Sequence, residues 1–289
     1  MKTLMYMASL VLFFQNVLYA QSLRVELAEY LQNSSNYTVI DVREKADYDK
    51  GHIKGAINFP VLKTYEHKKE NGKVTNPIRM QKQLRAVGLD IDSNILIYDK
   101  GGFLNSSRMF WTLEVYGFKN VKLLNIDFDL WYKKDKNKKY LSAKVPNIIP
   151  SEYIVTIDNK KLATKFTTLI AIKNPNQLII DARNEPFYQG LKSKAKRYGH
   201  IPSALNIPAT KNIKKDHTGF KLKTLSEFKE LYKNIDKNSK VITYCTHGKR
   251  SAANYFALRE LGYNVSAYDS SWQEWGNDFN LPVENPSKK

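Results

Sequence analysis

The sequence contains a single cysteine, Cys245, among 289 residues. One cysteine cannot form an internal disulfide, so no disulfide framework can support the fold. No cysteine or histidine spacing typical of a zinc site occurs. Hydrophobic residues make up 42% of the chain, which is enough for apolar cores, and the length suits two domains of about 100–150 residues. We therefore expect a globular protein with neither a metal nor a cofactor.

Acidic residues are also scarce, with 28 Asp and Glu against 46 Lys and Arg, for a formal charge of +18. A basic surface attracts nucleic acids, anionic membranes or small anions. The lysines are scattered, however, and no long basic block or aromatic nucleic-acid motif accompanies them. We expect a solvated basic surface, with steering of small anions as the second interpretation and no nucleic-acid partner.

The N-terminus has the pattern of a targeting segment. Lys2 precedes an apolar run over residues 4–14, and Ala20 offers a cleavage site before Gln21. The run is too short for a comfortable membrane span of about 20 residues. We predict a signal peptide over residues 1–20 and an exported, periplasmic protein. An uncleaved membrane anchor remains the alternative, whereas a buried first helix is disfavoured because no polar face interrupts the run.

The chain repeats itself. The matching pairs are 39–43 with 179–183, 51–60 with 199–208, 94–98 with 240–244, 106–116 with 251–261, and 121–124 with 265–267. In each copy, strand-like runs alternate with helix-like segments, and the last helix ends at a glycine suited to a helix C-terminus. This alternation predicts an α/β fold in which each of two tandem domains is a parallel sheet flanked by helices.

The predicted domains are residues 21–132 and 152–289. The Lys-rich segment 133–151, which contains Pro146 and Pro150, is the predicted linker. Pro77 suits the first turn of a helix that runs to Val87. Thr224 and Glu227 have the spacing of a capping box at the start of a further helix.

Cys245 lies just after an apolar strand, 241–244, and just before a helix. In open α/β sheets, ligands bind at the carboxyl ends of the strands. Gly248 allows a tight loop whose N–H groups point inward, and the following helix adds its positive end. Lys249 and Arg250 add full charges. All of these features favour a thiolate, whereas a structural buried cysteine would have apolar neighbours.

This loop, the helix after it and Trp272 to Trp275 resemble the catalytic domain of the rhodanese family. Residues 181–183 and 199–202 resemble an earlier signature of that family, and residues 23–132 resemble the non-catalytic first half of tandem-domain rhodaneses. The resemblance implies that Cys245 takes a sulfane sulfur from thiosulfate, holds it as a persulfide and passes it to cyanide or a thiol.

The resemblance also suggests roles for the neighbours of Cys245. The loop N–H groups, including those of Thr246 and Gly248, would stabilise the charged sulfur. Lys249 and Arg250 would hold the sulfonate of the donor. His247 is either a further hydrogen-bond donor to the substrate or a solvent-exposed loop residue.

In the first repeat, Asp99 is aligned with Cys245. A carboxylate cannot carry a persulfide and repels anionic donors, so we expect the first domain to be catalytically silent and to pack beside the second. A retained functional carboxylate is the alternative. Some tandem rhodaneses carry a substrate-binding arginine where this chain has Phe187; Arg197 could replace it, or Arg250 could suffice, which leaves the donor open.

Four charged residues and two histidines recur at equivalent positions of the repeats, and we expect structural roles for them rather than catalytic ones. The charged residues, which should form ion pairs, are Asp41, Arg43, Asp181 and Arg183. The histidines are His52 and His200.

Three rival functions remain to be compared. Cysteine phosphatases of related fold have five residues between the cysteine and the arginine, whereas four separate Cys245 from Arg250. The smaller ring suits a sulfur atom better than a phosphate, and arsenate reduction is disfavoured equally. Mercaptopyruvate sulfurtransferases tend to have a less charged loop, yet that activity stays an alternative. A sulfur-carrier or partner-binding module, with the basic surface docking a protein acceptor, also stays open.

Overall fold

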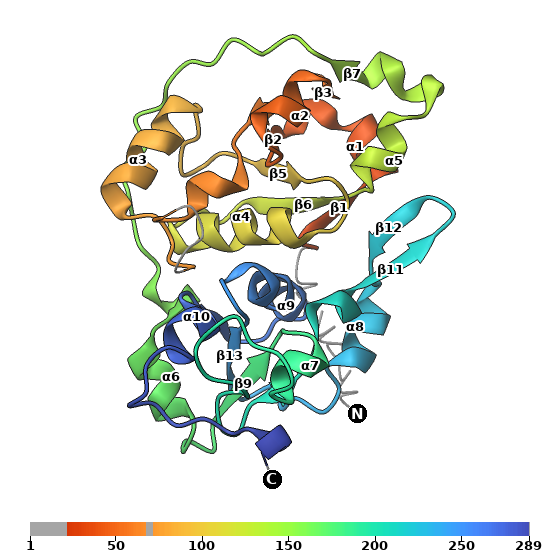
Figure 1. The fold of residues 1–289 in the computed structure, drawn as a ribbon. Helices are drawn as coiled ribbons and strands as arrows, with labels where there is room; N and C mark the ends of the chain where they lie inside the picture. Colours follow the sequence, from red (N-terminus) through yellow and green to blue (C-terminus); the bar gives the residue numbers. More distant parts are fainter. Residues whose placement is uncertain (1–21, 68–71, 289) are drawn as a thin grey trace, which may run out of the picture.

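The computed structural model describes residues 22–67 and 72–288, which form two α/β domains stacked on each other (Figure 1). The first domain, in orange to yellow, lies above the second, in green to blue. The expected fold class is confirmed. The predicted signal peptide lies outside the described residues, and no helix within them is both long and apolar enough to cross a membrane.

The first domain is built on a five-stranded parallel sheet in the order β1-β6-β5-β2-β4. Its central strands are short apolar runs covered on both faces, as a parallel sheet requires. The strands are β1 Arg24–Glu26, β2 Thr38–Asp41, β4 Ile57–Asn58, β5 Ile95–Tyr98 and β6 Val121–Asn125. The helices are α1 Leu27–Gln32, α2 Lys45–Asp49, α3 Pro77–Ala86, α4 Leu104–Val115 and α5 Phe128–Tyr132.

The second domain repeats this design, with a parallel sheet in the order β10-β9-β13-β14-β8. It adds an antiparallel hairpin, β11–β12, that reaches toward the first domain (Figure 1). The strands are β8 Leu162–Ala163, β9 Gln177–Asp181, β10 Leu205–Asn206, β11 Ile213–Asp216, β12 Gly219–Leu222, β13 Lys240–Tyr244 and β14 Val265–Tyr268. The helices are α6 Lys165–Ala171, α7 Glu185–Tyr188, α8 Leu225–Leu231, α9 Lys249–Glu260 and α10 Ser271–Trp275.

The structural roles expected for the repeated charged residues are confirmed. In each domain an arginine pairs with the aspartate two residues before it, and the pair is buried: Arg43 with Asp41 at 2.6 Å and Arg183 with Asp181 at 2.5 Å. Each histidine stacks on a tyrosine, with ring centroids 3.7 Å apart for His52 and 3.8 Å apart for His200. These contacts fix the turns that follow β2 and β9.

The helix boundaries follow local chemistry. Pro77 occupies the first turn of α3, as predicted, and Asn76 caps that helix. The capping box of Thr224 and Glu227 is present at α8. Helices α4 and α9 begin two residues earlier than the repeat suggests, because the residue before each is left-handed: Phe103 at φ 56° and Gly248 at φ 76°.

Part of the segment predicted as the linker packs on the first domain. Strand β7, Leu141–Ser142, pairs antiparallel with β3, His52–Ile53. Farther on, the Tyr153 hydroxyl donates to the carbonyl of Tyr116 at 2.6 Å. The chain therefore follows the surface of the first domain before β8 starts the second sheet.

The two domains share one continuous apolar core that runs across their interface. Helices α4 and α9 face each other there, with the rings of Phe110 and Phe256 edge to face at 5.1 Å. The Tyr255 hydroxyl donates to Glu114 at 2.5 Å, and Arg259 pairs with the same carboxylate at 2.7 Å. Because burial and paired charges act together, the domains form one body rather than two independent units.

Candidate active site

Cys245 is the first residue after β13, at the carboxyl end of the central strand of the second sheet, and it is 2% exposed. Its backbone N–H donates to the Ser271 hydroxyl at 3.1 Å, and its carbonyl accepts from the N–H of Trp272 at 2.9 Å. The Ser251 hydroxyl donates to the Cys245 sulfur at 3.6 Å. The sulfur is thus held at the N-terminal end of α9.

The rest of the loop is held from two sides. The carbonyl of Thr246 accepts from the N–H of Gln273 at 3.1 Å, which ties the loop to α10. Gly248 is buried and left-handed, and a Cβ on it would overlap the guanidinium of Arg108. Glycine is therefore required at this position both by its backbone conformation and by the close approach of the first domain.

The matching loop of the first domain surrounds a carboxylate, that of Asp99, with backbone N–H groups. Asp99 directly follows β5, and each of its two carboxylate oxygens accepts hydrogen bonds from the loop. One oxygen accepts from Gly101 N–H at 2.8 Å and Phe103 N–H at 3.2 Å. The other accepts from the N–H groups of Asn105 and Ser106, both at 3.0 Å, and from the Ser106 hydroxyl at 3.2 Å. The loop is an occupied anion nest.

The two loops have equivalent surroundings in the two domains. Tyr98 and Tyr244, each the last residue of the central strand, donate to Asp41 and Asp181 at 2.5 and 2.7 Å. Asp99 and Cys245 follow them directly. The loop of the first domain is one residue longer, since four steps lead from Asp99 to its left-handed residue and three lead from Cys245 to Gly248.

The equivalence extends to the helix N-termini. Ser106 and Ser251 both place a hydroxyl on the residue that follows the strand, a carboxylate in one domain and a thiol in the other. The first N–H groups of a helix have no partner inside the helix. In α9 the N–H groups of Arg250 and Ser251 stand at the positions of Asn105 and Ser106, which donate to Asp99 in the first domain.

The six predicted site residues, 245–250, all lie in this loop. Cys245, Thr246 and Gly248 are buried, His247 and Lys249 are half-buried, and Arg250 is exposed. The charged side chains therefore lie at the outer side of the loop and the sulfur at its inner side. Their roles toward a substrate stay predictions.

The structure adds residues that the sequence pattern did not single out. Tyr65, from the first domain, is buried, and burial raises its pKa to about 12, with smaller effects from Arg108, which lowers it, and Cys245, which raises it. The phenol therefore lies within electrostatic reach of the thiol. Ser251 could have been found from the sequence, because the repeat carries Ser106 at the equivalent position. Nothing in the sequence related Tyr65 or Arg108 to a loop more than 130 residues away.

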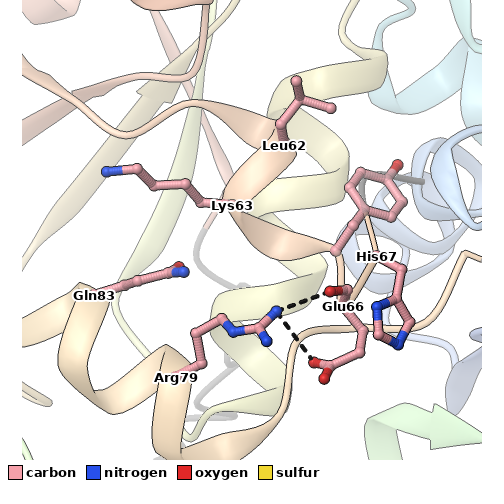
Figure 2. A pocket seen from close by; sticks show the side chains of 7 residues that line it. Leu62, Lys63, Glu66, His67, Arg79 and Gln83 are labelled. Carbon is pink, nitrogen blue, oxygen red and sulfur yellow. Dashed lines mark hydrogen bonds and ion pairs between the residues drawn. The ribbon is translucent and has the colours of Figure 1, made fainter. Parts of the chain in front are cut away.

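A pocket of about 440 Å³ lies in the first domain between α3 and the short 3-10 turn Val61–Thr64. Figure 2 shows Arg79 reaching across it to Glu66. Arg79 donates to the Glu66 carbonyl at 2.8 Å, and Asn76 N–H donates to its carboxylate at 2.6 Å. The hydrogen bonds from Asn76 lower the pKa of Glu66. This network fixes the chain directly after Tyr65.

The structure shows what one of the two candidates to replace an arginine at Phe187 contacts. The guanidinium of Arg197 donates to the carbonyls of Trp275, Asp278 and Leu281. These bonds hold the segment after α10 and give Arg197 a structural role. Arg250 remains the arginine of the loop itself.

Among the residues that the structure describes, no cluster of three His, Cys, Asp or Glu side chains is placed to hold a metal ion. The loop itself offers a thiol, the first N–H groups of α9 and the cations of Lys249 and Arg250.

Comparison with known proteins agrees with this architecture. The profile of the family described as rhodanese-like domain matches residues 24–134 and 163–278. A protein of Saccharopolyspora erythraea, to which thiosulfate sulfurtransferase activity is attributed, is 30% identical over 277 residues, covering 91% of this chain and 95% of its own. The 3-mercaptopyruvate sulfurtransferase of Escherichia coli strain K12 is 26% identical over 245 residues, covering 82% of this chain and 85% of its own.

The fold of a solved structure matches equally well. The crystal structure of SseA from Escherichia coli, described as a 3-mercaptopyruvate sulfotransferase with the rhodanese fold, superposes with a TM-score of 0.74 at 24% identity. The match covers 87% of this chain and 99% of that one. Both domains and their mutual arrangement are therefore shared.

Proposed function

The chain belongs to the rhodanese-like domain family, and relatives named as sulfurtransferases match it over most of its length. We propose that it transfers the sulfane sulfur of thiosulfate to cyanide or a thiol through a persulfide on Cys245. One observation carries the proposal. The only sulfur nucleophile of the chain stands where the silent loop places a carboxylate inside a nest of N–H groups.

In the first step, the Cys245 thiolate attacks the outer sulfur of thiosulfate. A new sulfur–sulfur bond forms, the sulfur–sulfur bond of thiosulfate breaks, and sulfite leaves with the electron pair. The nest stabilises the negative charge on sulfur before and after the transfer, because its donors are held in place by the loop and the start of α9. The Ser251 hydroxyl already donates to the sulfur at 3.6 Å.

In the second step, the acceptor attacks the outer sulfur of the persulfide. A bond forms between the acceptor and the outer sulfur, the bond between this sulfur and Cys245 breaks, and Cys245 returns to the thiolate. The product is thiocyanate from cyanide, or a persulfide from a thiol. No redox partner is needed, since the sulfane sulfur only changes its bonding partner. Lys249 and Arg250, at the start of α9, would attract the sulfonate of the donor and release sulfite into solvent.

Mass spectrometry of the intact protein tests the reaction class. After treatment with thiosulfate, we expect a gain of one sulfur atom on Cys245, which cyanide removes. The variant Cys245→Ser is the matched control and should gain nothing. If the wild-type protein takes up no sulfur, or if the serine variant does so, the proposed function is wrong.

A second candidate donor is 3-mercaptopyruvate, because the Escherichia coli relative is named for it. The carboxylate of this donor carries one negative charge, whereas thiosulfate carries two. The basic loop of this chain therefore favours thiosulfate. Measuring kcat/KM for both donors with one acceptor decides between them, and a higher value for 3-mercaptopyruvate would assign the second activity.

We further propose that the enzyme acts after export, on the basis of the N-terminal residues alone. Determining the first residue of the mature protein, together with its distribution between periplasmic and cytoplasmic fractions, tests this proposal. An intact N-terminus in the cytoplasmic fraction would reject it.

A further inference from the structure

Arg108 lies in α4 of the silent domain, yet it contacts the catalytic loop of the other domain. Its side chain is fully buried. One guanidinium nitrogen lies 3.3 Å from the Asp269 carboxylate and 3.5 Å from the carbonyl oxygen of Gly248. The other lies 3.1 Å from the carbonyl oxygen of Gly72. A single cation thus joins three segments that meet beside the loop.

The guanidinium also lies over two aromatic rings. Its carbon is 4.3 Å from the centroid of the Tyr65 ring and 4.5 Å from that of Trp111. A desolvated cation in contact with two aromatic rings is strongly held, so small movements of the side chain do not shift its position. Arg108 therefore behaves as a fixed point from which the loop is oriented.

Asp269 completes this arrangement from the second domain. It directly follows β14, and its carboxylate accepts the N–H of Val74 at 2.6 Å in addition to its pairing with Arg108. Burial raises the pKa of Asp269, and the charge of Arg108 opposes that shift. Removing Arg108 would leave a buried carboxylate without its cation, which is a costly state.

The contact at Gly248 is the one that matters for chemistry. Gly248 is the left-handed residue at which the loop turns into α9, and its rotation sets the direction of the N–H groups that follow. We propose that Arg108 is a positioning residue of the silent domain, which holds the Gly248 peptide so that the nest faces the Cys245 sulfur. This inference rests on the proposed function and deepens it.

The proposal gives the silent domain a role in catalysis that does not require Asp99. The antiparallel bridge between Tyr65 and Val74 and the helix α4 would together form a rigid support for the loop of the other domain. Breaking this support should reduce thiolate stabilisation, because donors that are poorly aligned stabilise an anion less.

The test is the rate at which iodoacetamide alkylates Cys245, followed from pH 5 to pH 10. For Arg108→Gln we expect the alkylation rate near neutral pH to fall roughly tenfold, which corresponds to about 1.4 kcal/mol. Arg108→Lys keeps the charge but cannot reach all three carbonyl and carboxylate partners together. It should therefore lie between the wild type and Arg108→Gln.

The matched control is Glu114→Gln, which removes a different interdomain ion pair: Glu114 contacts Tyr255 and Arg259, which lie farther along α9 than the catalytic loop. It should lower thermal stability while leaving the alkylation profile within about twofold of the wild type, as expected for a change that does not touch the site. Equal effects of Arg108→Gln and Glu114→Gln would reduce Arg108 to a domain-docking residue and overturn the proposal. If Arg108→Gln does not fold, Arg108→Lys and Asp269→Asn carry the same comparison.

Steady-state kinetics add a second readout. A positioning defect should lower kcat more than it raises KM for thiosulfate, because the defect lies at the sulfur and not at the donor sulfonate. Alkylation needs no sulfur donor, so it tests Arg108 even if thiosulfate is not the substrate. An unchanged alkylation profile for Arg108→Gln would reject the inference, whereas failure of sulfur uptake by the wild type would reject only the proposed function.

Discussion

Replacing Asp99 by alanine tests the central comparison between the two loops. The carboxylate accepts four backbone N–H groups and the Ser106 hydroxyl. Each donor left without a partner costs about 1–3 kcal/mol when it stays buried. Water enters the emptied nest, and the cost of burying a carboxylate disappears. We therefore expect the free energy of unfolding to fall by about 2–4 kcal/mol rather than by the full sum.

The assay is urea unfolding followed by tryptophan fluorescence, with and without formate. Formate has the shape and charge of the group that Asp99→Ala removes. If the nest is an anion site, formate should restore part of the lost stability in the variant and should leave the wild type unchanged. Asp49→Ala is the matched control in the same domain. Asp49 forms an exposed pair with Lys45 at 2.7 Å, and such pairs contribute about 0–1 kcal/mol.

Sulfur transfer by Asp99→Ala should stay within about threefold of the wild type under conditions where the variant is folded, because sites that share no partners act nearly independently. Two results would refute the reasoning. A stability loss no greater than that of Asp49→Ala would mean that the nest does not hold its carboxylate tightly. A large loss of turnover in a folded variant would mean that the first domain takes part in the chemistry.

Three further changes probe the site and the fold. Cys245→Ser should abolish thiosulfate:cyanide sulfurtransferase activity, and any activity retained by this variant would exclude the persulfide mechanism. Arg250→Ala should raise KM for thiosulfate about fivefold to tenfold with kcat little changed, as expected for the loss of uniform binding of a charged group; an unchanged KM would remove this exposed arginine from the donor site. The pKa of Glu227 is lowered from 4.5 to about 2, chiefly by its hydrogen bond with Lys214. Above pH 4.5, the free energy of unfolding of the wild type should therefore exceed that of Glu227→Gln. That advantage should disappear as the pH falls toward 2, because the depressed carboxylate is then protonated in both states, and pH-dependent urea unfolding of the two proteins measures it.

Much of the fold followed from periodicity and repetition. Alternating short apolar runs and helix-like segments predicted two parallel sheets, and the duplicated signatures predicted which turns correspond. The ion pair between Asp181 and Arg183 was predictable because the partners lie two residues apart. The start of α9 was placed two residues too late, because only the observed backbone shows that the helix begins directly after the left-handed Gly248.

The site was predictable only in part, for a reason of geometry. Residues 245–250 form one local loop, so their proximity follows from sequence. Arg108 and Tyr65 reach that loop through the packing of α4 against α9, which depends on how two whole domains dock. No local pattern encodes such a contact. Arg197 shows the converse limit: its place in a basic insertion suggested substrate binding as one alternative, and only the structure shows that three carbonyl groups near α10 accept from it.

Under the proposed function, the two loops also explain how a copy without the cysteine can persist beside one that carries it. A nest of N–H groups at the end of a parallel strand is unstable when empty, because its donors lose water on folding without gaining a partner. Asp99 satisfies the nest of the first domain permanently, so α4 can serve as a rigid support. In the second domain the corresponding position holds a thiol, to which the Ser251 hydroxyl donates. Under the proposed function, the N–H groups at the start of α9 would be satisfied by a persulfide at this position, so the identity of one side chain would decide between a structural and a catalytic role.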